Sequence, residues 1–229
     1  MKPILRAMWL LSAASVAPLH AATVFADDFS ETDGTEISGK APDVGSAWTG
    51  TAPTIVAGTY DSTGAGRGTF GNFTVALGAG QVLTLTYDSM VPNGGAFFTT
   101  GWAGVSLYAG GSERLFTGDS GVDTIWSVDQ AAVLGLNLSS PGDSTEITSV
   151  TLQYYYDTGA WAFSTTSGVN LSGTGLAFEA FDQIRIANGS GGDIRIDNLN
   201  VDISAVPEPS ASLFAGLSVL GLGFLRRRA

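Results

Sequence analysis

Cysteine is absent from this 229-residue sequence, and the one histidine, His20, lies close to the N-terminus. We expect the first residues to be removed, for reasons given below, so the mature domain has neither a thiol nor an imidazole. These absences exclude disulfide bonds, a cysteine nucleophile, a serine–histidine–aspartate triad and a zinc site built on histidine or cysteine. The domain must therefore rely on its hydrophobic core for stability, and it is long enough to do so.

Positive charge is also scarce. Residues 23–205 contain five lysines and arginines and twenty aspartates and glutamates, a formal charge of −15. A surface of this kind repels nucleic acid and anionic lipid, so we expect neither as a partner. It suits neutral glycans, divalent cations, or simply solubility outside the cell.

The N-terminus has the three parts of a secretory signal peptide. Lys2 and Arg6 form a positive region, residues 7–17 are apolar, and Pro18 is followed by small residues up to Ala22. The apolar run is far shorter than the roughly 20 residues of a spanning helix, which favours cleavage over a permanent anchor. We therefore expect residues 1–22 to be a signal peptide and the remainder to be exported.

The C-terminus, residues 206–229, combines a short rigid motif, an apolar run and a cluster of positive charge. The motif is Pro207, Glu208 and Pro209; the apolar run is 211–225; the cluster is Arg226, Arg227 and Arg228. Arginines directly after an apolar segment stay on the cytoplasmic side of a membrane. The alternative is a plain C-terminal anchor with an incidental Pro-Glu-Pro sequence.

This arrangement resembles the PEP-CTERM sorting signal of Gram-negative bacteria. The resemblance implies transient insertion in the inner membrane, processing by the membrane protease exosortase, and export through the periplasm to the cell surface or beyond. Proteins with this tail typically occur in organisms that make exopolysaccharide or a biofilm matrix. The tail thus indicates destination rather than activity.

Residues 23–205 show the pattern of an all-β domain. Short alternating runs separated by Gly, Asn, Asp and Ser recur every 10–15 residues or so, which is typical of an antiparallel β-sandwich. The turn at 157–160 favours a hairpin between its flanking strands. The runs expected to form strands are 82–87, 96–108, 131–138, 146–156, 161–165, 181–187 and 194–203.

The two ends of this domain are similar to those of concanavalin-like, or laminin-G-like, jelly rolls. The opening segment 27–48 and the closing segment 193–201 carry the resemblance. It implies a jelly roll in which the first and last strands lie side by side. If those strands pair, Asp28 and Asp197 converge, and carboxylate oxygens are ligands that Ca²⁺ prefers. We therefore expect a structural calcium site at Asp28 and Asp197; the alternative is that both are turn and edge acids.

Glycan binding in such folds uses flat aromatic rings. The candidates are Tyr155, Trp102 and Trp126, and the Tyr154–Tyr156 run places ring 155 on the strand face opposite its neighbours. The alternative for each ring is a place in the core.

No catalytic residue is expected. Hydrolysis without histidine or cysteine needs a carboxylate pair, whereas the glutamates of this sequence are scattered and form no Glu-x-Asp-x-Glu cluster. The expected function is non-catalytic binding or organisation of extracellular polysaccharide, or adhesion. A structural matrix protein without a specific ligand and a carboxylate-dependent glycan hydrolase remain the alternatives.

Overall fold

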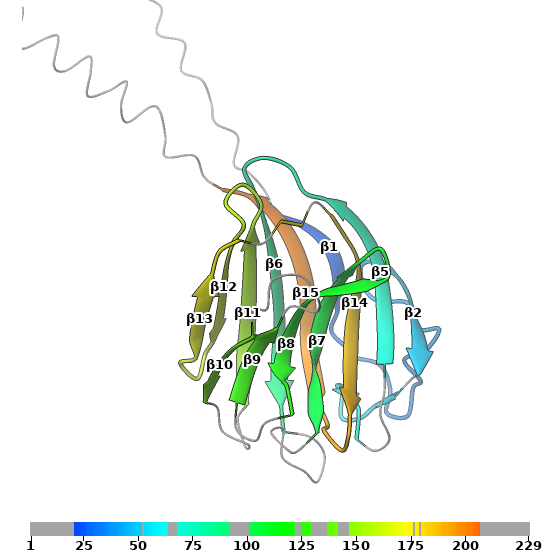
Figure 1. The fold of residues 1–229 in the computed structure, drawn as a ribbon. Helices are drawn as coiled ribbons and strands as arrows, with labels where there is room; N and C mark the ends of the chain where they lie inside the picture. Colours follow the sequence, from blue (N-terminus) through cyan, green and yellow to red (C-terminus); the bar gives the residue numbers. More distant parts are fainter. Residues whose placement is uncertain are drawn as a thin grey trace, which may run out of the picture.

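The computed structural model describes residues 21–51, 53–63, 68–91, 101–121, 125–129, 137–141, 147–175, 177–178 and 180–206. These residues form two antiparallel β-sheets that pack face to face (Figure 1). This confirms the expected all-β jelly roll. The described part contains no helix long and apolar enough to cross a membrane.

One sheet has eight strands, and β15 (Arg195–Ala205) lies at its centre, flanked by β6 and, at different points along its length, by β1 and β4. The other strands of this sheet are β1 (Ala22–Asp27), β3 (Thr54–Ile55), β4 (Tyr60–Asp61), β6 (Gln81–Met90), β11 (Thr148–Tyr155), β12 (Ala160–Thr165) and β13 (Asn170–Gly173).

The second sheet has seven strands, in the order β10-β9-β8-β7-β14-β5-β2. Its strands are β2 (Ser46–Thr51), β5 (Gly68–Ala76), β7 (Trp102–Ala109), β8 (Ser112–Asp119), β9 (Ile125–Asp129), β10 (Asn137–Pro141) and β14 (Ala180–Gly189). Sequence neighbours such as β7 and β8 pair directly, whereas β5 and β14 are joined across more than a hundred residues.

The core forms between the sheets because apolar residues alternate along each strand. In β6, Leu83, Leu85 and Tyr87 point inward and are buried, while Thr84 and Thr86 between them are partly exposed. Burial of these apolar faces supplies the main driving force for folding, at about 25 cal/mol per Å².

The first and last strands lie side by side, as the jelly-roll resemblance implied. Strand β1 pairs antiparallel with β15, with Phe25 opposite Val201 and Asp27 opposite Leu199 (Figure 1). The hairpin around 157–160 is also confirmed, since β11 and β12 pair in register from Tyr155 opposite Ala160 onward. Of the strand expected at 131–138, residues 131–136 lie outside the described residues, and β10 contains the rest.

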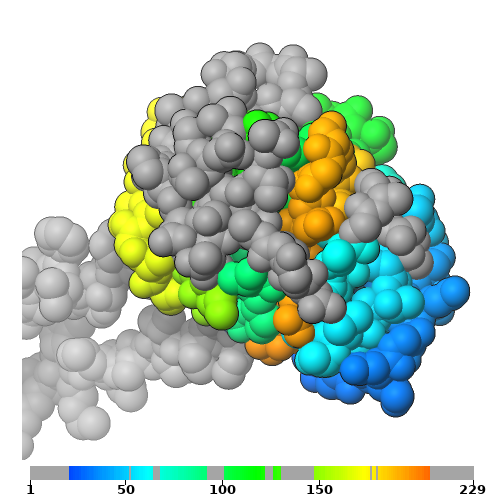
Figure 2. Space-filling model, turned by 90° about the horizontal axis from the view of Figure 1, so that it is seen from below, coloured from blue at the N-terminus to red at the C-terminus, as the bar shows by residue number. Residues whose placement is uncertain are grey.

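At the end of the sandwich seen in Figure 2, hydrogen bonds join segments that are distant in the sequence. Ser62 Oγ donates to Ile194 O (2.9 Å) and accepts from Ile194 N (2.7 Å), and the buried Asn188 donates to Gly192 O (2.6 Å). The cyan segment around 60–63 and the orange segment around 188–194 therefore lie side by side in that view. Residues 1–20 of the expected signal peptide and the sorting tail from residue 207 onward lie outside the described residues, whereas Ala22, the last residue of the expected signal peptide, begins β1 opposite Ile203.

Candidate functional site

The seven-stranded sheet has an outer face, directed away from the core, that carries an unusual mixture of rings and polar groups. Core residues alternate with these positions along each strand, for example Val105 and Leu107 around Ser106. The outward side chains from the four neighbouring strands β5, β14, β7 and β8, with those of β9, include Phe70, Asn72, Arg185, Gln183, Trp102, Ser106, Tyr108, Glu113, Phe116, Ser127 and Asp129. We call this set the outer-face cluster.

Arg185 on β14 is the centre of the outer-face cluster. Its guanidinium carbon lies 5.5 Å from the centroid of the Phe70 ring and 5.6 Å from that of Trp102. Its Nη1 donates a hydrogen bond to Tyr108 Oη (2.9 Å), and Tyr108 in turn meets Phe70 edge-on, with centroids 5.7 Å apart. The arginine is thus fixed by three rings from the two strands that flank β14, through two cation–π contacts and one hydrogen bond.

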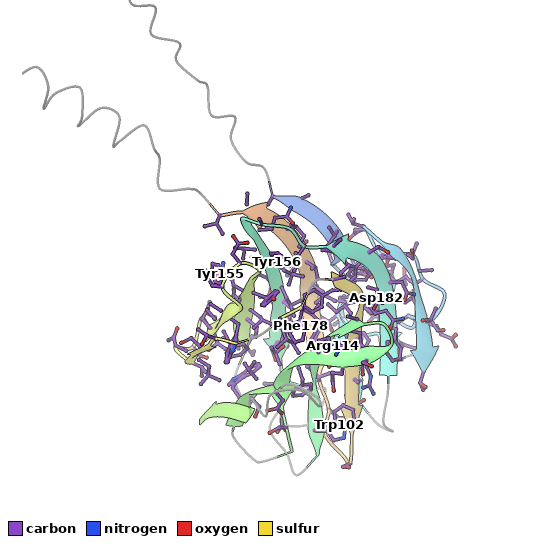
Figure 3. The ribbon with its side chains drawn as sticks, turned by 45° about the horizontal axis from the view of Figure 1, so that its top comes forward. Trp102, Arg114, Tyr155, Tyr156, Phe178 and Asp182 are labelled. Carbon is purple, nitrogen blue, oxygen red and sulfur yellow. The ribbon has the colours of Figure 1, made fainter. Side chains whose placement is uncertain are left out.

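Trp102 has its place in the cluster because Gly189 lies opposite it. The two residues are cross-strand partners, and a Cβ added to Gly189 would lie only 2.6 Å from the indole Nε1 and 2.7 Å from Cε2. The indole therefore lies directly over the backbone of β14, which only glycine permits. Figure 3 shows Trp102 at the lower end of β7.

Two carboxylates, those of Glu113 and Asp129, belong to the part of the outer-face cluster formed by β8 and β9. Glu113 on β8 accepts a hydrogen bond from Ser106 Oγ, and Ser106 is only 2% exposed. Asp129 lies on the neighbouring strand β9, where its register partner is Phe116. Burial, together with the nearby charge of Glu113, raises the pKa of Asp129 from 3.8 to about 6. Asp129 therefore exchanges its proton nearer to neutral pH than an ordinary aspartate does.

A different acidic group lies where β1 meets β15. Carboxylate oxygens of Asp27, Asp28 and Asp43 lie within 4.8 Å of one another. Asp27 is fully engaged inside the protein: its oxygens accept from Lys40 Nζ (2.6 and 2.8 Å), from Trp48 Nε1 (2.6 Å) and from a backbone amide. The buried ammonium of Lys40 thus already neutralises Asp27, which leaves the exposed Asp28 and Asp43 as the oxygens open to a cation.

The expected calcium residues, Asp28 and Asp197, come close enough to interact. Asp197 is opposite Asp88 in the pairing of β15 with β6. Burial raises the pKa of Asp197, and the charges of Asp88 and Asp28 raise it further. One oxygen of Asp28 accepts from Ser30 N (3.1 Å), and Asn198 donates to Asp88 (2.8 Å). The calcium site stays a prediction; Asp43 and Asp88 are neighbours that sequence reasoning did not identify.

The three ring candidates do not converge on one site. Trp126 was a wrong choice: it is 0% exposed and packs in the core against Phe163, with centroids 5.7 Å apart. Tyr155 lies on the outer face of the opposite sheet, where its hydroxyl donates to Gln153 (3.0 Å). Trp102 alone of the three belongs to the outer-face cluster; Figure 3 shows it far from Tyr155.

Sequence reasoning missed Arg185, Tyr108, Phe70, Glu113 and Asp129. The period-two pattern of each strand could have placed each of them on an outward position. The pattern does not reveal that β5, β14, β7, β8 and β9 are adjacent, and adjacency is what creates the cluster.

No protein-family model matches the chain, and no curated protein matches it. Solved structures do. An endo-1,3-β-glucanase from Streptomyces sioyaensis is similar with a TM-score of 0.56 and 12% identity, over 84% of this chain and 100% of that chain.

Two plant proteins are similar over nearly their whole length. Arcelin-5, a lectin-like defence protein from Phaseolus vulgaris, has a TM-score of 0.54 and 11% identity, over 82% of this chain and 99% of that chain. A seed lectin from Lotus tetragonolobus has a TM-score of 0.52 and 12% identity, over 81% of this chain and 100% of that chain. At these identities the likeness concerns the fold: the chain is a concanavalin-like jelly roll of the type found in legume lectins.

Proposed function

We propose that this protein is an exported, non-catalytic glycan-binding protein and that the outer-face cluster is its binding site. The carrying observation is the cluster itself: partly exposed rings lie beside an arginine, two carboxylates and two amides on one face of a sheet. Sugars present apolar faces that pack on rings and hydroxyls that need fixed hydrogen-bonding partners. Similarity in fold to lectins supports the same function.

The destination part of the proposal rests on the two termini. A signal peptide at 1–22 and a sorting tail at 206–229 would deliver the domain to the surface of a Gram-negative bacterium after processing by exosortase. There it would bind or organise extracellular polysaccharide. Expression in a host with and without exosortase tests this part, since only the processed form loses the tail mass.

Retention on polysaccharides tests the binding part. The purified protein is passed over a panel of neutral and acidic polysaccharides, with Ca²⁺ and with EDTA. Trp102→Ala should weaken retention roughly tenfold, equivalent to about 1.4 kcal/mol. Tyr155→Ala, on the opposite sheet, is the matched control and should bind like the original protein. If Tyr155→Ala loses binding and Trp102→Ala keeps it, the site has been assigned to the wrong face.

A second candidate function is glycan hydrolysis, and one observation favours it. Glu113 and Asp129 lie near enough for the charge of Glu113 to raise the pKa of Asp129, although they are 16 positions apart in the sequence, and that raised pKa suits a proton donor. Release of reducing ends from β-glucans, abolished in Glu113→Gln and in Asp129→Asn, would establish this function. Retention without any release of reducing ends leaves glycan binding as the function.

A further inference from the structure

The guanidinium of Arg185 has unused hydrogen-bonding capacity. Tyr108 Oη is its one hydrogen-bond acceptor among the described residues, and no described carboxylate pairs with it. Its Nε is buried and has no acceptor among the described residues. A buried donor without an acceptor costs about 1–3 kcal/mol of stability. Since Arg185 is at the centre of the outer-face cluster, a ligand that supplies an acceptor to its Nε would remove this cost.

The edge of the guanidinium formed by Nε and Nη2 lies beside Gly68. A Cβ added to Gly68 would lie 3.5 Å from each of these two nitrogens, so this edge of the guanidinium faces backbone that carries no side chain. Two parallel N–H donors of an arginine match the two oxygens of a carboxylate. Phe70 and Trp102 both contact the guanidinium and restrict its movement, which favours a fixed position of this edge.

We propose that the glycan recognised by the outer-face cluster carries a carboxylate, as in uronic acid sugars, and that Arg185 binds this carboxylate through Nε and Nη2. This inference rests on the proposed glycan-binding function and names its ligand class. The sugar ring packs against the aromatic side chains, and Glu113 and Asp129 accept hydrogen bonds from its hydroxyls. It revises the expectation of a neutral ligand that the net charge suggested.

The strongly acidic chain repels long polyanions, so the test uses short oligosaccharides in which one or two carboxylates reach the arginine. Isothermal titration of the full-length protein compares trigalacturonate with its methyl ester, which keeps the sugar and removes the charge. The acid should bind roughly 10- to 100-fold more tightly than the ester, the range expected for a charge-assisted pair.

Two arginine variants locate the contact. Arg185→Lys keeps the charge but loses the fork, and should reduce affinity for the acid at least tenfold, and by a larger factor than it reduces affinity for the ester. Arg195→Lys is the matched control, because Arg195 lies on the other sheet and already donates through Nε to Thr59 (2.7 Å) and through Nη2 to Val56 O (3.3 Å). Thermal melting verifies that each variant is folded; the comparison of acid and ester on the original protein needs no variant.

The outcomes separate the two proposals. Equal affinity for acid and ester leaves glycan binding intact and overturns the carboxylate assignment. Equal affinity for a sulfated oligosaccharide overturns the preference for a carboxylate over other anions. If Arg195→Lys no longer binds the acid while Arg185→Lys still does, the assignment of the carboxylate contact to Arg185 is overturned. No binding to any oligosaccharide, acidic or neutral, overturns the proposed function together with this inference.

Discussion

The buried pair of Lys40 and Asp27 offers the sharpest test of how this fold is stabilised. The Lys40 ammonium lies 2.6 Å from an oxygen of Asp27 and 2.7 Å from one of Glu31, and the side chains of Lys40 and Asp27 are 6% and 0% exposed. Burial lowers the pKa of Lys40, but its hydrogen bonds to Asp27 and Glu31 outweigh burial and leave the pKa raised above 10.5. The lysine therefore remains charged throughout the physiological range.

The perturbation is Lys40→Met, which keeps most of the side-chain volume and removes the charge. The carboxylate of Asp27 would then be buried without its cation, and loss of one partner of a buried pair costs about 3–5 kcal/mol. For a domain of 150–250 residues, each 1 kcal/mol corresponds to a shift in Tm of about 2–4 °C. We therefore expect Tm to fall by roughly 6–20 °C at pH 8, measured by differential scanning calorimetry.

The pH dependence of this loss identifies its cause. Burial already raises the pKa of Asp27 in the folded state above 3.8, and removal of Lys40 takes away a group that lowers it. An acid whose folded pKa is raised destabilises the fold when it is ionised, so its cost shrinks as the pH falls through that pKa. The deficit of Lys40→Met should therefore be smaller at pH 5 than at pH 8.

The double variant Asp27→Asn with Lys40→Met is the control. It leaves no buried charge at positions 27 and 40, and it should recover part of the stability lost in Lys40→Met. The reasoning is refuted if Lys40→Met lies within 1 kcal/mol of the original protein, or if its deficit grows as the pH falls.

Three further outcomes follow from the site. Asp129→Asn should increase stability at pH 8 by about 1–2 kcal/mol, less than the roughly 3 kcal/mol upper limit of a shift from 3.8 to about 6, because solvent screens a partly exposed group. The gain should shrink as the pH falls below about 6 and vanish only below 3.8, so that urea titrations of the two proteins should coincide at about pH 3. Gly189→Val should displace Trp102, which is measured as a change in tryptophan fluorescence, and should weaken glycan retention. Unchanged fluorescence would contradict the packing of the indole on Gly189. Added Ca²⁺ should raise Tm and EDTA should lower it, and Asp197→Asn should abolish the difference; a melting curve insensitive to both reagents would remove calcium from the account.

Several features of this protein could be predicted from the sequence because they depend on local pattern. Alternation of apolar and polar residues and the spacing of turns indicate a β-sandwich whatever the order of its strands. The run from Tyr154 to Tyr156 places Tyr155 on the opposite face from Tyr154, which the structure confirms: Tyr154 is buried and Tyr155 is partly exposed. The absence of cysteine, and of histidine beyond His20, excludes whole classes of chemistry without any coordinates.

Tertiary structure alone decided which ring belongs to the core and which residues meet. Trp102 and Trp126 stand in similar alternating runs, yet one lies outward over Gly189 and the other is enclosed between the sheets. Arg185 meets Phe70 and Tyr108 because β5 and β7 flank β14, although 115 and 77 positions separate these residues along the chain. Alternation assigns a residue to one of two faces of its strand, but strand order determines its neighbours, and strand order is settled by packing of the whole core.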